Sequence, residues 1–553
     1  MPAAERHSSD NEDWGLMKSS TTASSRANRA GGRPLLIFAA ALIALTLAVI
    51  VAGCGSSTAS SSASPSSAPI KMGGVLKIGA EYGNGNFDPV LFAGSVGDLQ
   101  LQAQIYQGLV TPGPDYSVQP LLAAKWSSPN GKVWTFTLRS GVRFSNGQPF
   151  SSADVVYSMN RVRSTKLGSP DASLFANVKS ITAPNPTTVV FNLNGVDSEF
   201  PASLTEYREL MLCKSVKNPA KNPVGTGPFM LKSISPEDQA ILVKNPYYWG
   251  KDAQGNQLPY LDQLDFVYSP DISGQVASLQ GGALNYVATL NSEQKQIVQS
   301  SSSLQLLQQV SNYCYELQIR CDQKPGSNLK VRQALLAGTN LASIAALVDP
   351  GVATPGNATL VGPVYKADYL STVPAYDPAK AKQLLAQAGY PSGLKLTLVA
   401  QNAPPMPDIA TAWVAQMAKI GVNASIQEVP TGSYYTDKGT DTWYEAPFGI
   451  VDWGPRATPI TFFKLCLTSD APWNYSRWKD PQFNSITQQI ATTLNPAARS
   501  ALYRQAQQIL QEQVPMINFG EFSGVAGVSK DVDGIALAPD WSRTVFGDAH
   551  FTQ

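Results

Sequence analysis

Residues 376–400, YDPAKAKQLLAQAGYPSGLKLTLVA, indicate the fold class of this chain. Asp377 suits a helix N-cap, because its carboxylate accepts a hydrogen bond from a free backbone N–H, and Pro378 suits the first helical position, where no N–H is needed. Apolar residues follow at helical spacing until Gly389. The stretch therefore predicts a helix that ends at this glycine.

The segments that follow alternate between strand and helix. Leu394 to Val399 predicts a strand, Ile409 to Ala418 a helix, and Arg499 to Gln513 a further amphipathic helix. Because alternating strands and helices build α/β layers, this part of the chain predicts an α/β domain at about 311–514.

The chain upstream shows a different pattern. Residues 75–80 alternate as a strand, a Gly/Asn-rich loop follows, and 99–109 carry apolar residues near helical spacing. Several short strands with Pro/Gly turns come next, and Ser151 is placed to cap a helix. We expect a small α+β subdomain at about 113–222.

The stretch LLIFAAALIALTLAVIVAGC, Leu35 to Cys54, predicts where the chain resides. Arginines precede it, it contains no charge and it ends in small residues, as in an export signal. Val-Ala-Gly-Cys is similar to the lipobox of bacterial lipoproteins, so 1–53 are the predicted signal peptide and Cys54 the lipidation site. A membrane-spanning helix is the alternative, since about 20 apolar residues cross a bilayer. Met17 is a second possible start.

A serine-rich segment follows this cysteine. GSSTASSSASPSSAP, residues 55–69, has no large apolar side chain, and we interpret 54–72 as a flexible tether. Its coil reach is only about 20 Å, which predicts a domain held close to the outer face of the cytoplasmic membrane.

Composition excludes several classes of function. Lys plus Arg number 41 and Asp plus Glu 40, so the concentrated basic surface that nucleic acid needs is not expected. His550 is the only histidine after the signal region, which argues against Ser-His-Asp catalysis and His-bound zinc. We expect no cofactor and no metal.

Four cysteines besides Cys54 remain, Cys213, Cys314, Cys321 and Cys466. An even number outside the cytoplasm allows two disulfides, and four buried free thiols are the alternative. Cys314 and Cys321 would lie roughly 23 Å apart along a strand, beyond the ~7 Å limit for a disulfide, so these two should not pair.

Several segments in a fixed order resemble a known family. They are GGVLKIG (73–79), IYQGLV (105–110), TFTLRSGVRFSNGQPFSSADVVYS (135–158), NPVGTGPF (222–229), NPYYWG (245–250), VRQAL (331–335) and LYRQAQQILQEQVPMINFGEF (502–522). Together they resemble the peptide/nickel class, family 5, of solute-binding proteins of ABC importers, over nearly all of the chain after the signal region.

This resemblance implies an α/β, type II periplasmic-binding-protein fold with two lobes. Lobe I would comprise 73–310 with the small subdomain, lobe II 311–514, and residues 515–553 would return to lobe I. Two thin crossings over a cleft make a hinge, and such clefts hold ligands. The implied function is capture of a peptide or other small solute, by a monomer that delivers it to the permease subunits in the membrane.

Aromatic residues in the predicted second lobe are candidates for the walls of that cleft. They are Tyr313, Tyr315, Tyr434, Trp443 and Trp453, with Tyr435 and Tyr444 nearby. By resemblance, the loop of Phe92, Gly94 and Ser95 should line the cleft from the first lobe.

The segment DWGPRATP, residues 452–459, is the candidate polar site. In peptide binders of the family an Asp before a D/E-P-x-x-F segment captures the ligand's amino terminus. Aligned on Pro459, that position is Pro455 here, with Asp452 three residues earlier and Arg456 adjacent. A buried Arg456 would favour an anionic group, whereas Asp452 would favour a cation; an exposed, paired Arg456 is the alternative.

Two other function classes remain open from the residues. Carboxylate-only hydrolysis needs just two Asp/Glu residues, so a membrane-anchored hydrolase is a rival to binding without catalysis. A receptor lipoprotein that uses the same fold without transport is another. We expect a protein that is not an enzyme.

Overall fold

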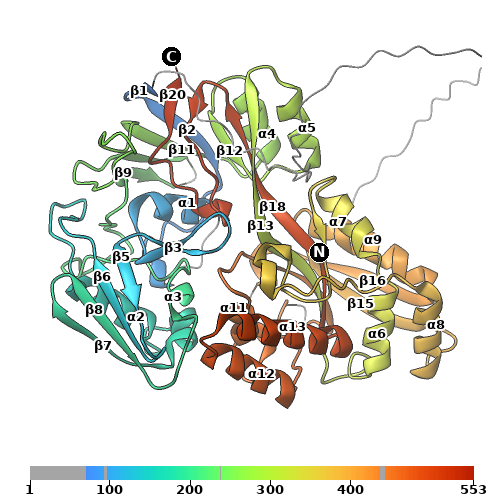
Figure 1. Cartoon of the computed structure of the whole chain (residues 1–553). Coiled ribbons are helices and arrows are strands. Elements are labelled where there is room, and N and C mark those ends of the chain that lie inside the picture. Colours follow the sequence, from blue (N-terminus) through green and yellow to red (C-terminus); the bar gives the residue numbers. More distant parts are fainter. Residues whose placement is uncertain (1–69, 92–95, 237, 436–441, 553) are drawn as a thin grey trace, which may run out of the picture. The chain divides into compact units, whose positions relative to one another are not determined.

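The computed structural model describes residues 70–91, 96–236, 238–435 and 442–552 (Figure 1). The predicted signal region, Cys54 and most of the tether lie outside this part of the chain, as do Phe92, Gly94 and Ser95.

The largest sheet has eleven strands. Ten of them lie side by side in the order β16 (Val422–Val429), β15 (Leu394–Gln401), β17 (Phe448–Trp453), β13 (Leu304–Ile319), β18 (Met516–Ser529), β12 (Tyr286–Ala288), β2 (Val75–Ala80), β11 (Gln263–Tyr268), β10 (Gln239–Lys244) and β9 (Phe229–Ser235). The eleventh, β14 (Thr354–Pro355), pairs with β18. Below, "first lobe" means the β12-to-β9 half with the elements packed on it, and "second lobe" the β17-to-β16 half.

Two long strands, β13 and β18, connect these halves (Figure 1). They pair antiparallel from Leu304 opposite Ser529 to Gln318 opposite Met516, with irregularities after Gln309 and after Tyr315. A bulge interrupts the regular ladder and increases local twist. The chain thus passes between the halves within a strand pair.

Packing along β18 changes from one lobe to the other. Ile517 and Phe519 are buried in a hydrophobic cluster of the second lobe, whereas Val525 and Ala526 are buried in clusters of the first lobe. The return to lobe I at 515–553 was implied by the family resemblance and stays a prediction. Strand β18 begins at Met516, and its packing partners change between Phe519 and Val525.

The second lobe has the predicted α/β alternation. Asp377 caps α8 (Pro378–Gln387) by accepting a hydrogen bond from Lys380 N at 2.9 Å. Strands β15 and β16 run parallel, with α9 (Met406–Lys419) between them in the chain. Trp413 of α9 is fully buried, and its Nε1 donates to Thr339 Oγ1 at 3.0 Å. The α/β prediction is confirmed.

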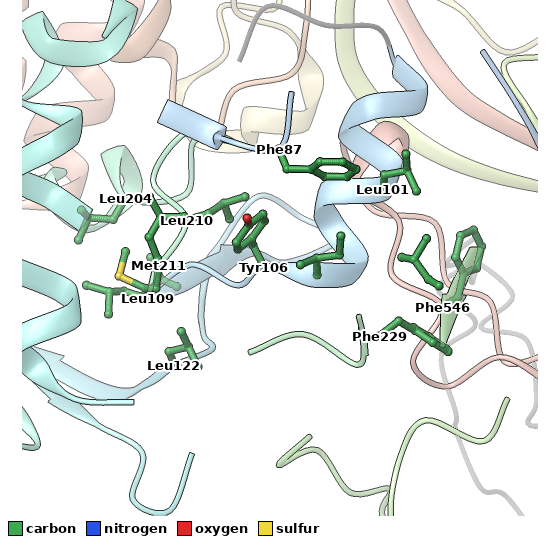
Figure 2. Packing of buried hydrophobic residues seen from close by; sticks show 14 of the residues in the cluster. Phe87, Leu101, Tyr106, Leu109, Leu122, Leu204, Leu210, Met211, Phe229 and Phe546 are labelled. Atoms are coloured by element: carbon green, nitrogen blue, oxygen red, sulfur yellow. The ribbon is translucent and has the colours of Figure 1, made fainter. Parts of the chain in front are cut away.

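The first lobe has its own hydrophobic core, which Figure 2 shows around Tyr106. This tyrosine follows α1 (Val96–Ile105), and its ring lies among side chains that include Phe87, Leu101 and Leu210. All are buried, so the helix is fixed on the sheet by apolar packing.

A four-stranded sheet in the order β5 (Ala123–Ser127), β6 (Val133–Leu138), β8 (Thr188–Leu193) and β7 (Val178–Asn185) belongs to the same core. Helix α2 (Ser152–Val162) contacts it, and Ser151 N donates to the Asp154 carboxylate at 3.0 Å at the helix start. Phe136, Phe191 and Phe200 form a ring cluster inside it.

The remaining elements include short strands and turns as well as longer helices. They are β1 (Ile70–Lys71), η1 (Pro89–Leu91), β3 (Val110–Pro112), β4 (Val118–Pro120), η2 (Pro170–Phe175), α3 (Phe200–Ser203), α4 (Ile272–Gln280), α5 (Ser292–Ser300), α6 (Leu329–Ala337), α7 (Leu341–Val348), η3 (Pro363–Asp368), α10 (Thr431–Tyr434), α11 (Pro459–Phe462), η4 (Phe463–Leu467), α12 (Pro481–Thr492), α13 (Pro496–Gln513), β19 (Val532–Asp533), η5 (Trp541–Arg543) and β20 (His550–Thr552).

The four cysteines in the described part of the chain are free thiols, which decides between the two alternatives left by the sequence. Cys213, Cys314 and Cys466 are buried. Burial raises the pKa of Cys314 and of Cys466 well above the ordinary thiol value, so both stay protonated and unreactive.

Within the described ranges, no single helix combines the length and hydropathy needed to cross a bilayer. The helices α6 and α7 meet these criteria only as a pair, bent by 59°.

Candidate functional site

Asp452 lies at the end of β17, beside the long strand β13. It is paired with Tyr315 of β13, and its side chain is half-buried. The hydroxyls of Tyr313 and Tyr435 both donate hydrogen bonds to its carboxylate, and Tyr435 Oη also accepts one from Asp452 N at 3.2 Å. Two phenols therefore hold this carboxylate in one orientation.

The two tyrosines keep their role as donors. Burial, and then the negative charge of Asp452, raise the pKa of Tyr313 well above its ordinary value, so the hydroxyl stays protonated. A carboxylate has about four acceptor positions, and two phenols use two of them. Asp452 can therefore accept further hydrogen bonds, as from an ammonium group.

Aromatic rings surround this carboxylate. Trp541 of η5, in the first lobe, lies 5.1 Å from Tyr313 between ring centroids. Trp443 lies 5.9 Å from Tyr435. Rings from both lobes thus meet beside Asp452, where they can exclude water and pack against an apolar ligand group.

Arg456 is buried three residues beyond β17 and is held by its backbone. Asn312 of β13 donates to Arg456 O at 2.8 Å and accepts from Arg456 N at 3.1 Å. Tyr365 Oη also donates to Arg456 O, at 2.9 Å. The position of this residue is therefore fixed by β13 and η3.

The guanidinium of Arg456 faces the first lobe. Its Nε lies 3.6 Å from Glu206 Oε2, and both side chains are less than one-tenth exposed. Its Nη1 donates to Gly454 O and Pro455 O, while neither Nε nor Nη2 has a hydrogen-bond partner among the described residues. Because Nε is close to Glu206, Nη2 is the nitrogen available to an anion.

The charges of this ion pair depend on each other. Burial disfavours charge on Arg456, but the negative charge of Glu206, together with Tyr207, Asp171 and Asp540, outweighs this effect and raises the pKa of Arg456. Burial raises the pKa of Glu206 to about 7, and the positive charge of Arg456 opposes that rise. Glu206 therefore titrates near neutral pH.

The first lobe contains further buried charged residues near Glu206. Arg208 forms an ion pair with Asp171 at 3.1 Å. Glu209 is fully buried, and neither of its carboxylate oxygens has a hydrogen-bond partner in the described part of the chain. Burial, together with the charges of Asp171 and Glu206, raises the pKa of Glu209 well above its ordinary value. Glu209 is therefore expected to be neutral at pH 7.

A segment of the first lobe, Asp197 to Glu199, contacts the helices of the second lobe elsewhere. Ser198 N donates to Ala491 O of α12 at 2.8 Å. Lys464 Nζ lies 3.3 Å from Asp197 Oδ2. We call residues 197–199 the latch segment, because both contacts join the lobes.

Glu199 adds an ion pair and a side-chain hydrogen bond to this contact. Arg499 Nε of α13 lies 3.3 Å from its Oε1, and Tyr503 Oη donates to its Oε2. Burial raises the pKa of Glu199 to about 7, against the effect of Arg499. The segment therefore joins the lobes by charge as well as by backbone hydrogen bonds.

The predicted site residues are distributed over three places. Tyr313, Asp452 and Trp443 lie together around Tyr435, and Tyr315 lies 5.4 Å from Tyr313 between ring centroids. Their role as ligand contacts stays a prediction. Arg456 lies at the contact with Glu206 instead.

Tyr434 and Trp453 are packed inside the second lobe. The Tyr434 hydroxyl donates to Ile450 O, and Trp453 Nε1 donates to Glu316 Oε1 at 2.9 Å. Both side chains belong to a buried cluster. Successive strand residues point to opposite faces, which is why Trp453 is buried while its neighbour Asp452 is not.

Sequence reasoning missed the first-lobe side of this region. Three charged residues stand close together at 206–209: Glu206, Arg208 and Glu209, with Tyr207 between the first two. Apolar residues lie on both sides, at 204 and at 210–212. Charged residues are rarely buried unless they are paired. A cluster of charges inside an apolar segment was therefore the sequence feature that could have identified these residues. No such feature of the sequence pointed to Trp541 as a residue of this region.

The family assignment follows from comparison with known proteins. Residues 117–474 match the family described as bacterial extracellular solute-binding proteins, family 5, middle region. The chain belongs to this family, and it is therefore an extracytoplasmic solute-binding component of an ABC importer.

Individual relatives agree with this assignment. The glutathione-binding protein GsiB of Salmonella typhimurium is 28% identical over 453 residues, which cover 79% of this chain and 86% of GsiB. The periplasmic binding protein DppA of Helicobacter pylori, solved with the peptide STSA, has a TM-score of 0.74 at 26% identity and covers 87% of this chain and 99% of its own. The murein tripeptide binding protein MppA of Escherichia coli shares the fold, with a TM-score of 0.75 at 21% identity, over 88% of this chain and 99% of its own.

Proposed function

We propose that this chain captures a small peptide-like solute between its lobes and delivers it unaltered to the permease. Asp452 would bind the ammonium group of the solute, and Nη2 of Arg456 would bind an acidic group. The single observation that carries the proposal is the Asp452 carboxylate, oriented by Tyr313 and Tyr435 but not saturated by them. Glutathione and the peptide STSA, the ligands named for two relatives, both carry the two charged groups.

Lobe closure is the proposed mechanism, with β13 and β18 as the hinge and lobes at about 73–310 and 311–514, completed by 515–553. A ligand that contacts both lobes binds the closed form better than the open form and shifts the population toward it. A shift from 1:99 to 99:1 requires about 5.5 kcal/mol of preference for the closed form. A micromolar dissociation constant corresponds to about 8 kcal/mol.

The protein is further proposed to be a monomeric lipoprotein. Two acyl chains on Cys54 would provide the two hydrophobic signals that stable anchoring requires. The serine-rich tether would then keep the binding lobes near the permease. Metabolic labelling with a fatty acid, in the natural host, tests this: Cys54→Ala should abolish the label.

Calorimetry with glutathione and with STSA tests the binding proposal. Native mass spectrometry of protein purified from its own host should in addition reveal a co-purified solute. Saturable one-to-one binding supports the proposal. If neither probe binds and no solute co-purifies, the peptide-like ligand class is wrong.

The rival hydrolase is distinguished by chromatography of the same probes after incubation. A substoichiometric amount of protein should leave glutathione and STSA unchanged if the protein only binds. Conversion of either probe would favour a carboxylate hydrolase instead. The receptor lipoprotein is distinguished by its gene neighbourhood. A permease gene next to the gene of this chain would argue against it, and the absence of one would favour it.

Arg456 provides a direct test of the anionic subsite. Because Arg456→Ala alone would leave Glu206 buried without its partner, we pair it with Glu206→Gln. The double variant should bind glutathione more weakly by ~1.5–3 kcal/mol, the contribution of one charged hydrogen bond. The single variant Glu206→Gln is the matched control. Equal affinity of the double variant and this control would remove Arg456 from the site.

The latch segment predicts a change in lobe closure without any ligand. Glu199→Ala removes the partner of Arg499 and the acceptor of Tyr503, so the contact between the lobes is weakened. We expect a larger radius of gyration by small-angle X-ray scattering. Glu293→Ala, at an exposed position of α5, is the control. An unchanged radius in Glu199→Ala would show that the latch segment does not hold the lobes together.

A further inference from the structure

A cavity of about 330 Å³ lies against the two hinge strands, apart from Asp452 and Arg456. Its walls include Ser311 of β13, Glu521 and Ser523 of β18, Thr354 of β14, and Pro363 and Val364 of η3. Val310 also lines it and is 60% exposed, so the cavity is accessible from solvent.

Glu521 is the only carboxylate on this wall among the described residues, and it has no protein partner there. Its side chain is 7% exposed, and no hydrogen bond or ion pair to its carboxylate occurs in the described part of the chain. Burying a charged group without a partner is costly, so such a group is normally paired or neutral. Glu206 and Glu199, by contrast, each have an arginine.

The carboxylate lies directly against the Cα of Gly362. A Cβ at Gly362 would be 1.8 Å from Glu521 Oε1. The backbone of Gly362, at φ −111°, is one that any residue can adopt. A side chain at 362 would therefore displace the carboxylate from this position, whereas glycine leaves room for it against the loop.

The lining of the cavity indicates the chemistry of a guest. The cavity has one acidic side chain and no Lys, Arg or His, and the hydroxyls of Thr354 and Ser523 have no hydrogen-bond partner among the described residues. Valine and proline side chains supply the apolar part. Groups of three or more His, Cys, Asp or Glu that suit a metal ion do not occur in the described ranges. Divalent cations need more carboxylate ligands than this cavity has.

We propose that this hinge cavity binds a small primary amine, with Glu521 as the partner of its ammonium group. An ammonium has three N–H donors, which the carboxylate and the hydroxyls of Thr354 and Ser523 can accept. The short alkyl part would pack on Val310 and Val364. Since β13 and β18 both line the cavity, the guest contacts both hinge strands.

Binding at this site should be detectable as the release of the Glu521 carboxyl proton. Burial raises the pKa of Glu521 to about 8, so the carboxyl is mostly protonated at pH 7. The titratable groups that sense its charge are Tyr116, Cys314, Tyr365 and Tyr369, all of which stay protonated at this pH. On η3, Lys366 is paired with Asp115 at 3.0 Å. Binding of an ammonium ion to the ionised carboxylate therefore releases the carboxyl proton to the solvent.

The test is calorimetry with n-propylammonium chloride on the folded chain at pH 7, in two buffers of different ionisation enthalpy. We expect millimolar affinity and release of nearly one proton per amine bound. Glu521→Gln should lose the proton release and at least tenfold in affinity. Gly362→Ala, whose Cβ displaces the carboxylate, should do the same, and Ser523→Ala should weaken binding a few-fold.

Two controls separate this site from the interlobe site. Asp452→Asn should leave n-propylammonium binding unchanged, and Glu521→Gln should leave the binding of glutathione unchanged. The proposal is overturned if n-propylammonium does not bind, if Asp452→Asn abolishes its binding, or if K⁺ binds equally well with the same proton release. Failure of glutathione to bind would contradict the proposed function alone.

Discussion

Asp452→Asn is expected to reduce the affinity for glutathione about 100-fold. The substitution keeps the shape of the side chain but removes the charge that would pair with the ligand's ammonium group. Truncating one partner of a buried charge pair typically costs about 2–5 kcal/mol, and 2.8 kcal/mol corresponds to 100-fold. Isothermal calorimetry at pH 7 measures this change directly.

A matched variant controls for surface charge. Asp470→Asn makes the same chemical change at an exposed position in the second lobe and should leave the affinity unchanged. Thermal unfolding checks that both variants fold. If Asp452→Asn bound glutathione as tightly as Asp470→Asn does, the ammonium of the solute would have to be bound elsewhere.

Glu316→Gln is expected to stabilise the fold at alkaline pH, by about 4 kcal/mol at pH 8. Glu316 lies on β13 and is fully buried in the second lobe. Trp453 Nε1 donates to its Oε1, while Oε2 has no hydrogen-bond partner in the described ranges. Burial raises its pKa from 4.5 to about 8, against the effect of the Trp453 hydrogen bond. Each pKa unit of difference corresponds to about 1.36 kcal/mol.

The sign of the pH dependence follows from proton binding. Between pH 4.5 and 8 the folded protein holds a proton on Glu316 that the unfolded chain has lost. The free energy of unfolding therefore falls as pH rises through this window and levels off above it. Glu206 has a pKa of about 7 in the folded protein, so it lowers the free energy of unfolding further as pH rises from about 4.5 to 7.

Thermal melts at pH 5 and pH 8 measure this effect. The native protein should have the higher Tm at pH 5, and Glu316→Gln should reduce the difference. Glu428→Gln, an exposed position on β16, should keep the native difference. An unchanged pH dependence in Glu316→Gln would mean that Glu316 is ionised in the folded protein.

The sequence alone determined the type of local structure in most of the chain. Helices begin where Asp377 and Ser151 supply caps, because capping depends only on residues within one turn. The strand 394–399 and the helix 409–418 were also predicted from their apolar periodicity, which is a local property.

Tertiary structure decided where the charged groups meet. Asp452 and Arg456 are four residues apart, yet one is held by Tyr313 of the connecting strand β13 and by Tyr435, and the other lies against Glu206, some 250 residues earlier in the chain. Glu521 is part of a segment that the sequence singled out only for its family resemblance, and only the fold shows that it lacks a partner. The reason is physical: burial and pairing depend on which distant segments pack together, and a local pattern of residues does not contain that information.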